Sequence, residues 1–260
     1  MTRVAVVAAL HEELGALLRC MPDEVPVVRG GREFYVGTLD GHEVVAVLSR
    51  VGKVAAATTA TLLATEFNVA RAIFTGTAGG LHERARVGDV VVAGAVLQHD
   101  MDASPLFPRY EVPLYGVDRF HADPALSAAL ATAARDVLDD AAQARPDTAI
   151  DDALDAASLS AFGIVAPAVH TGLVVSGDRF VASAAECASL RERLPEALAV
   201  EMEGAALGQV CHDLGIAFAV VRTISDRADD SAHVDFSRFV ASIASRYTLA
   251  IIRRCLRDLD

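Results

Sequence analysis

Short apolar runs alternate along this chain with segments of helical length and composition. The apolar run 3–10 leads into a helix that we expect to begin near Glu12, and the helical segment 52–67 precedes the apolar run 70–81. Strands that alternate with helices build a sheet covered by helices. The hydrophobic fraction of 53% suits strands that are buried on both faces. The sequence therefore predicts an α/β fold.

One hairpin makes the predicted sheet mixed. Asp40-Gly41 joins two alternating runs within 32–49, and this dipeptide is a strong signal for a two-residue hairpin turn. Asp123 and Pro124 predict the N-cap and the first position of a helix over 123–138. Further strands are expected at 88–100, 170–177, 197–200 and 216–225, and further helices at 184–194 and 235–259. We expect a three-layer α/β/α arrangement around a mixed, twisted central sheet.

The chain of 260 residues shows neither an internal repeat nor a linker rich in Pro, Gly and Ser, so one domain over 1–260 is the economical prediction. Residues 139–160 are acidic, rich in alanine and poor in large apolar side chains. We expect this segment to form an exposed insertion that is partly helical.

Composition excludes several classes of protein. With 35 Asp and Glu against 23 Lys and Arg, the net charge of −12 argues against binding to nucleic acid or to an anionic membrane. The first apolar run is too short to span a membrane and lacks the layout of a signal peptide, so we expect a cytoplasmic protein. Four widely separated cysteines and scattered histidines without an HExxH motif predict no metal site, and no cofactor is expected.

Polar residues and glycines gather where the predicted strands end, and in α/β sheets ligands bind at the carboxyl ends of strands. The five ends are LHEE (10–13), TGTAGG (75–80), SGDRF (176–180), VEMEG (200–204) and TISD (223–226). Taken together they indicate a ligand site.

Each of these ends also has a purely structural interpretation. Glu12 and Glu13 complement the positive end of a helix, the glycines form a tight turn, and Asp226 caps a turn with Ser225. The pair Glu201 and Glu203 is harder to explain in this way, because burying unpaired carboxylates is costly. In an extended segment residues i and i+2 face the same way, so both carboxylates can address one cavity.

An ordered set of motifs carries a resemblance to a known family. The motifs are AALHEEL, RVGKVAAA, TGTAGGL, VGDVVV, VSGDRF, AVEMEGAA and RTISDRAD. In this order they resemble the nucleoside phosphorylase superfamily, and within it the 5′-methylthioadenosine/S-adenosylhomocysteine nucleosidases. The resemblance runs from Val4 to Ile252 apart from the insertion. It implies a nucleoside phosphorylase-like fold, a small-molecule nucleoside as substrate, and a homodimer.

The resemblance also implies roles for individual residues. Glu13 would activate water, and the helix N-terminus would favour its charged form. Asp226 would donate a proton toward N7 of adenine, which requires a raised pKa. Glu203 would bind the ribose 2′- and 3′-hydroxyls, with Met202 against the sugar and Glu201 in support. Further substrate contacts, Phe180 stacking on the base among them, are implied at Leu10, Val51, Thr77, Ala78, Phe180, Val181 and Ser225.

A loop from the second subunit completes the implied pocket. Residues 99–116 are rich in Pro, Leu, Phe and Tyr, and in the family this region reaches across a dimer interface to line the pocket for the 5′ substituent. The residues concerned are Leu106, Phe107, Tyr110 and Pro113 of the partner subunit. Their apolar character favours a thioether.

The implied reaction is hydrolysis of the N-glycosidic bond of 5′-methylthioadenosine, S-adenosylhomocysteine or both, with 5′-deoxyadenosine as a further candidate. Two carboxylates in ALHEEL would repel phosphate, which favours water as the nucleophile. Arg50 lies where a phosphate could be contacted, so a phosphate-dependent purine nucleoside phosphorylase remains an alternative. A non-catalytic nucleoside-binding relative is a second alternative, against which Glu13, Glu203 and Asp226 argue.

Overall fold

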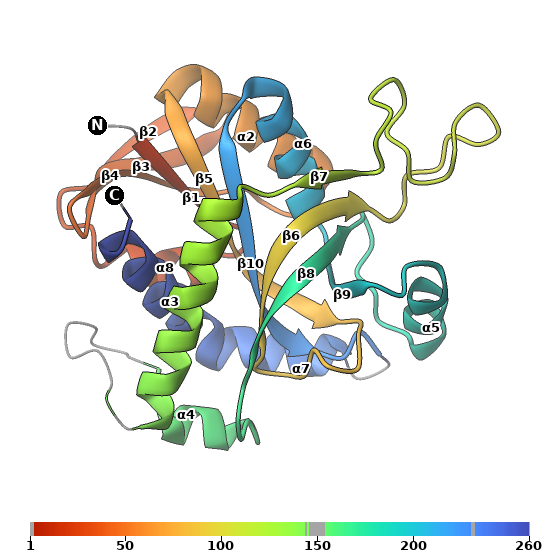
Figure 1. Cartoon of the computed structure of the whole chain (residues 1–260). Coiled ribbons are helices and arrows are strands. Elements are labelled where there is room, and N and C mark those ends of the chain that lie inside the picture. The colour runs from red at the N-terminus through yellow and green to blue at the C-terminus, as the bar shows by residue number, and fades with distance from the viewer. Residues whose placement is uncertain (1–2, 144, 146–153, 230–231, 260) are drawn as a thin grey trace.

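The computed structural model describes residues 3–143, 145, 154–229 and 232–259, and its centre is one ten-stranded sheet (Figure 1). The strands are β1 (Arg3–Ala8), β2 (Val25–Arg29), β3 (Arg32–Leu39), β4 (His42–Leu48), β5 (Val69–Gly80), β6 (Val90–Gln98), β7 (Arg119–His121), β8 (Val169–Ser176), β9 (Ala197–Glu201) and β10 (Ala217–Asp226). Their order is β10-β6-β8-β9-β5-β1-β4-β3-β2, with β7 on β6. Because β10 also pairs with β5, five of these strands close into a ring.

The sheet is mixed, as predicted. Strand β1 runs parallel to β4 and β5, whereas β3 and β4 form an antiparallel hairpin in which Leu39 pairs with His42. Asp40 and Gly41 at its tip both have positive φ angles, 46° and 88°. A type I′ turn requires positive φ at both central residues, which explains why this dipeptide marks the hairpin.

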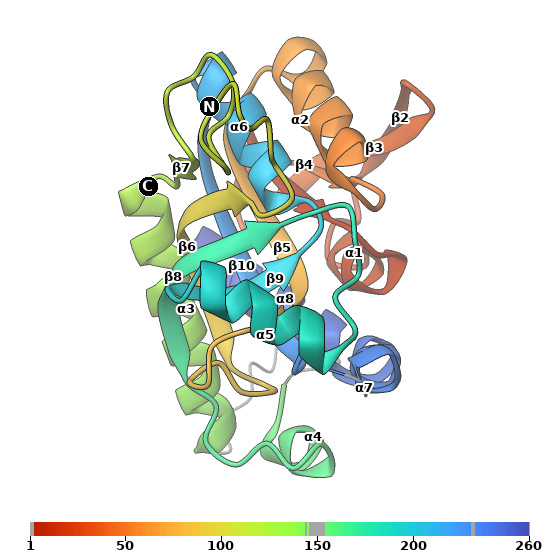
Figure 2. The same ribbon diagram turned by 90° about the vertical axis from the view of Figure 1, so that its right-hand side faces the viewer.

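Helices cover both faces of the sheet (Figures 1 and 2). The helices are α1 (His11–Leu18), α2 (Lys53–Phe67), α3 (Pro124–Ala142), α4 (Ala156–Ala161), α5 (Ala184–Arg193), α6 (Gly204–Leu214), α7 (Ala232–Phe239) and α8 (Ser245–Arg257). Val4 and Val6 of β1 pack with α1, α3 and α8, while Ala5 and Val7 pack with α2 and α6. Alternate residues of one strand thus enter two cores, which gives the expected three layers.

The ends of several helices agree with the sequence, and others differ. The Asp123 side chain accepts a hydrogen bond of 2.8 Å from the Leu126 N–H, so it caps α3 as predicted. The single helix predicted over 235–259 is instead α7, a π-helical turn (Val240–Ala244) and α8. The short strands β2 and β7 were not predicted, whereas α4 agrees with the partly helical character expected for 139–160. None of the described helices is long and apolar enough to cross a membrane.

The predicted insertion 139–160 lies partly outside the described residues. Helix α3 continues to Ala142, and Ala156–Ala161 forms α4. Leu154 and Leu159 are both buried in the core that contains α3. The expectation of an exposed segment is therefore wrong for these two positions and for Ala141, which is also buried, because apolar side chains are stabilised by burial in the core.

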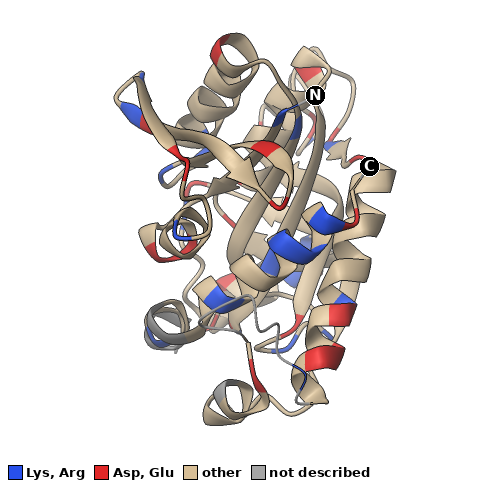
Figure 3. Cartoon of the chain, turned by 90° about the vertical axis from the view of Figure 1, so that its left-hand side faces the viewer, with Lys and Arg blue, Asp and Glu red and all other residues tan. Residues whose placement is uncertain are grey.

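Charged side chains form pairs between the helices on the outer face. Arg254 of α8 pairs with Asp136 of α3 at 2.7 Å, and Figure 3 shows basic residues of the C-terminal helix beside acidic residues of α3. Arg253 and Arg257 of α8 both reach Asp40 at the tip of the β3–β4 hairpin. These ion pairs connect the last helix to the first half of the chain.

Candidate active site

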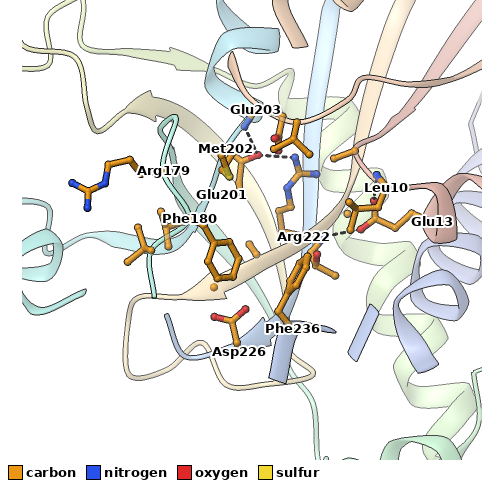
Figure 4. Close-up of a pocket in the computed structure, with 18 residues that line it drawn as sticks. Leu10, Glu13, Arg179, Phe180, Glu201, Met202, Glu203, Arg222, Asp226 and Phe236 are labelled. Carbon is orange, nitrogen blue, oxygen red and sulfur yellow. Dashed lines mark hydrogen bonds and ion pairs between the residues drawn. The ribbon is translucent and has the colours of Figure 1, made fainter. Parts of the chain in front are cut away.

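The ends of five strands surround one cavity of about 390 Å³ (Figure 4). All five polar strand ends that the sequence singles out contribute to its lining. The predicted site residues that line it are Leu10, Glu13, Val51, Thr77, Ala78, Phe180, Val181, Glu201, Met202, Glu203 and Asp226. The predicted site residues that meet here lie as far apart in the sequence as Leu10 and Asp226.

Glu13 projects from the first turn of α1 and is 1% exposed. Its Oε2 accepts the Leu10 N–H at 3.2 Å and its Oε1 accepts the Thr77 N–H at 3.1 Å. Burial raises the pKa of Glu13 to about 7, although Arg222 and these backbone donors oppose the rise. We expected the N-terminus of α1 to favour the charged form of Glu13. The raised pKa shows that this expectation is wrong, because the loss of solvation on burial has the larger effect on the pKa.

The glycines of TGTAGG make room for this carboxylate. The predicted turn is instead part of β5, which runs from Val69 to Gly80. A Cβ atom at Gly76 would lie 3.1 Å from Oε1 of Glu13, and one at Gly79 would lie 3.1 Å from Oδ1 of Asp226. Because glycine has no side chain, the backbone of β5 can lie close to Glu13 and Asp226 at these two positions.

Glu201 is held on every side by the protein. Its carboxylate accepts hydrogen bonds from Arg222 Nη2 at 2.7 Å and from the Gly204 N–H at 2.8 Å, and the Ser176 hydroxyl also donates to it. The Glu203 N–H adds a bond of 3.1 Å. Glu201 thus anchors the start of α6 and has little capacity left for a ligand.

Glu203 lies two residues further on and is far less occupied. It is 5% exposed, and among the described residues one protein group donates to its carboxylate, the Gly52 N–H at 2.8 Å. Burial, together with the nearby charge of Glu201, raises the pKa of Glu203 to about 7. Of the two carboxylates in AVEMEGAAL, Glu203 is the one free to bind a ligand in the cavity.

Arg222 is a lining residue that the sequence interpretation missed. It lies in β10, is 1% exposed, and stacks with its guanidinium carbon 4.2 Å from the centre of the Phe74 ring. Its charge compensates Glu201 directly and lowers the pKa of Glu13. The signal was available, because an arginine within the apolar strand IAFAVVRTIS is rarely buried without a partner.

Asp226 ends β10 and is 2% exposed. The Ser225 hydroxyl donates to its Oδ2 at 2.8 Å and the Ala228 N–H donates to its Oδ1 at 2.8 Å. Figure 4 places Asp226 at the opposite end of the cavity from Glu203. The structural interpretation of Asp226 as the cap of a turn is thus confirmed, and the same carboxyl group also lines the cavity.

Comparison with known proteins identifies the family. The family model described as "Phosphorylase superfamily" matches residues 3–257. The chain belongs to the phosphorylase superfamily. This match covers the whole cavity, from Ala9 to Phe236.

Solved structures of superfamily members agree along the full length. The chain is similar to 5′-methylthioadenosine/S-adenosylhomocysteine nucleosidase from Neisseria meningitidis, solved with methylthio-immucillin-A, at 33% identity, a TM-score of 0.84 and 100% coverage of both chains. Two structures of the corresponding enzyme from Streptococcus pneumoniae match at 30% identity, with TM-scores of 0.81 and 0.82 and 100% coverage of both chains. Futalosine hydrolase of Helicobacter pylori matches at 26% identity and a TM-score of 0.80, over 99% of this chain and 98% of that one.

Aromatic side chains form one wall of the cavity in this superfamily member. Phe180 is 44% exposed, and its ring meets that of Phe236 edge to face, with centroids 5.5 Å apart. Phe236 comes from α7 and was not predicted, because nothing in its local pattern sets it apart from a core residue. Val181 beside Phe180 is buried.

Some predicted residues lie outside the cavity of the single chain. Ser225 is behind its wall, where the hydroxyl bonds Asp226 and faces the Ala78 carbonyl at 3.4 Å. The Arg50 guanidinium is turned to the Gly31 carbonyl instead of the cavity. The four residues assigned to the pocket for the 5′ substituent are also absent from the lining, namely Leu106, Phe107, Tyr110 and Pro113. They belong to the long loops between β6 and β7, which project from the sheet (Figure 1).

Proposed function

We propose that this protein hydrolyses the N-glycosidic bond of an adenosine thioether and releases adenine. The preferred substrates are 5′-methylthioadenosine, S-adenosylhomocysteine or both, with 5′-deoxyadenosine as a further candidate. Similarity to nucleosidases and to a nucleoside hydrolase along the whole chain supports an N-glycosidic hydrolase. The observation that carries the assignment is one cavity lined by Asp226, Glu13 and Glu203, with Asp226 at the opposite end from Glu203.

Asp226 is the proposed general acid. Adenine leaves poorly as an anion, so a proton given to N7 weakens the bond between C1′ and N9. The Asp226 side chain is 2% exposed, so it lies in the enclosed surroundings that this role requires. The Ser225 hydroxyl and the Ala228 N–H fix the orientation of this carboxyl.

Glu13 is the proposed base for the attacking water. A pKa of about 7 leaves a large fraction of this group ionised near neutral pH and able to accept a proton. As the C1′–N9 bond breaks, the sugar gains oxocarbenium character, and the water oxygen bonds to C1′ while its proton passes to Glu13. Acid and base on opposite sides of the breaking bond follow the logic of inverting glycosidases.

Glu203 is the proposed ligand of the ribose 2′- and 3′-hydroxyls. A carboxylate with one protein donor retains acceptor capacity for two neighbouring hydroxyl groups. Met202 lines the cavity next to it and supplies an apolar contact for the sugar. Phe180, at the wall between Met202 and Asp226, is the proposed platform for the base (Figure 4).

The 5′ substituent is proposed to bind where a second copy of the chain completes the cavity. Leu106 and Leu114 are 84% and 91% exposed on the loops after β6. Large apolar side chains at such exposure are typical of an interaction surface. We propose a cytoplasmic homodimer in which Leu106, Phe107, Tyr110 and Pro113 of the partner subunit line the pocket for the thioether.

Water is favoured over phosphate as the nucleophile. Three buried carboxylates, Glu13, Glu201 and Glu203, surround the single buried guanidinium of Arg222 in this cavity. Phosphate would meet this excess negative charge, and Arg50 is turned away from the cavity. Adenine release that depends on phosphate and yields ribose 1-phosphate would establish the phosphorylase alternative instead.

A substrate panel tests the proposal as a whole. The protein is incubated with 5′-methylthioadenosine, S-adenosylhomocysteine, 5′-deoxyadenosine, adenosine and inosine, each with and without phosphate. Futalosine is included because a futalosine hydrolase is among the similar structures. We expect free adenine from the thioethers without phosphate. Binding of these nucleosides without release of any base would favour the non-catalytic alternative.

A further inference from the structure

Two adjacent backbone N–H groups before α2 bind carboxylates from two different segments. The Gly52 N–H donates to Glu203 Oε1 at 2.8 Å, and the Lys53 N–H donates to Asp178 Oδ1 at 2.7 Å. Glu203 lines the cavity, whereas Asp178 is exposed, lies in the segment after β8 and does not line the cavity. The position of one short turn thus determines where the donor to Glu203 lies.

Asp178 supplies the N-terminal capping group that α2 lacks in its own sequence. The N-cap residue of this helix is Gly52, which has no side chain to accept the free N–H groups of the first turn. Gly52 has a φ of +97°, and a Cβ atom there would lie 3.1 Å from Oδ1 of Asp178. Glycine therefore suits this position in two ways, by its backbone conformation and by the close approach of the Asp178 carboxylate.

Asp178 is itself held by a closed set of contacts. Its N–H donates to Asp100 Oδ2 at 2.9 Å, and Lys53 Nζ binds Asp100 Oδ1 at 2.6 Å. Lys53 also donates to Gln98 Oε1 at 3.1 Å, and its side chain is only 17% exposed. Lys53, Asp100 and Asp178 therefore connect the start of α2, the end of β6 and the loop after β8.

We propose that Asp178 is a positioning residue for Glu203. Asp178 caps α2 and, with Asp100 and Lys53, fixes the turn whose Gly52 N–H orients the Glu203 carboxylate. The inference rests on the proposed role of Glu203 in binding the ribose hydroxyls.

The geometry explains why this contact matters for Glu203. Among the described residues Gly52 is the one group that donates to the Glu203 carboxylate, whereas Glu201 has four donor groups. A carboxylate with a single anchor loses its orientation when that anchor moves. Binding two neighbouring hydroxyls requires that orientation, and small displacements weaken such contacts strongly.

The test compares one substrate pair on matched variants. We measure kcat/KM for 5′-methylthioadenosine and its 3′-deoxy counterpart with the wild type, Asp178→Ala, Asp178→Asn and Glu192→Ala. The 3′-hydroxyl is proposed to bind the charged carboxylate of Glu203. Removing this hydroxyl should therefore lower kcat/KM of the wild type by about 10- to 100-fold. In Asp178→Ala this loss shrinks to about 3-fold or less, while Asp178→Asn, which keeps an acceptor for the Lys53 N–H, retains most of it. Glu192, an exposed carboxylate on α5, is the control and leaves the loss unchanged.

The outcomes separate this inference from the proposed function. Differences in the intrinsic reactivity of the two substrates are the same for every variant and cancel in the comparison. If Asp178→Ala lowers kcat/KM for both substrates equally and keeps the full loss, Asp178 only stabilises the fold and the inference is wrong. If the wild type shows no loss on removing the 3′-hydroxyl, the role of Glu203 fails and the inference fails with it. Because the two substrates are compared on the same preparation, a partly unfolded fraction of Asp178→Ala lowers both rates equally and cancels from the ratio.

Discussion

Arg222 donates a hydrogen bond of 2.7 Å to Glu201 in the centre of the molecule, where the two side chains are 1% and 3% exposed. Each charge would be costly there without the other. The pair also joins two strands, because Arg222 lies within β10 and Glu201 ends β9. Through this contact the strand that ends at Asp226 is tied to the segment that presents Glu203.

Removing Arg222 should therefore destabilise the protein strongly. Arg222→Met leaves the Glu201 carboxylate buried without its cation, and we expect a loss of about 3–5 kcal/mol in the free energy of unfolding. Arg254→Ala breaks a pair with Asp136 that is more than a third exposed and should change stability by no more than about 1 kcal/mol. Urea denaturation of both variants provides the measurement. Equal, small effects would show that Arg222 does not compensate a buried charge.

Asp226 should be needed for bond cleavage rather than for binding. Asp226→Asn keeps the shape of the side chain but removes the acidic proton, so we expect kcat to fall by about 10²- to 10⁴-fold. Affinity for a non-hydrolysable nucleoside analogue, measured by calorimetry, should change little. Asp139→Asn on the exposed surface of α3 is the matched control. Full activity of Asp226→Asn would exclude this residue as the acid.

The rate should depend on pH through the buried carboxylates. Burial raises the pKa values of Glu13 and Glu203 to about 7, so both become protonated as pH falls below neutrality. A protonated Glu13 cannot accept a proton from water. We expect kcat/KM to fall about tenfold per pH unit on the acid side of pH 7, or more steeply if both groups contribute. A flat profile from pH 5 to pH 8 would contradict the proposed role of Glu13 as the base.

Stability should vary with pH in the opposite sense to activity. Because the pKa of Glu13 rises from 4.5 to about 7 on folding, the folded protein holds a proton between these values that the unfolded chain has released. The free energy of unfolding therefore falls as pH rises from about 4.5 to about 7. Relative to Glu13→Gln, the wild type should lose up to about 3 kcal/mol across this range. Guanidinium denaturation of both proteins at pH 5 and pH 8 measures the difference, and parallel behaviour of the two would refute it.

The loops after β6 should mediate self-association. Leu106 is 84% exposed, and Leu106→Asp places a charge on the proposed interface. We expect this variant to shift toward monomer in analytical ultracentrifugation and to lose kcat/KM for thioether substrates. Val165, 85% exposed near α4, provides the control in Val165→Asp. A protein that is monomeric and fully active would contradict the shared pocket.

Local signals explain which parts of the fold were predictable. The turn at Asp40-Gly41 needs two positive φ angles, and the cap at Asp123 needs a short polar side chain, so each depends on a few adjacent residues. The strand order depends on contacts between distant segments. β10 pairs with β5 on one side and antiparallel with β6 on the other, and no local pattern specifies either partner.

The same division applies to the site. Acids and glycines at the ends of apolar strands predicted which segments meet, because the sequence rarely places such residues there without a partner or a ligand. Phe236 could not be predicted, since it reaches the cavity only through the packing of α7 beside β10. Nor could the pKa of Glu13, which depends on how completely the folded chain excludes water from its carboxyl.

By itself, the sequence AVEMEGAAL determined that two carboxylates stand near one cavity. Only the tertiary structure decided how they differ. Arg222 arrives from β10 to bind Glu201, and Gly52 arrives from the turn before α2 to bind Glu203. The number of donors that reach each carboxylate depends on strands and turns far apart in the chain, and that number is what leaves Glu203 available to a ligand.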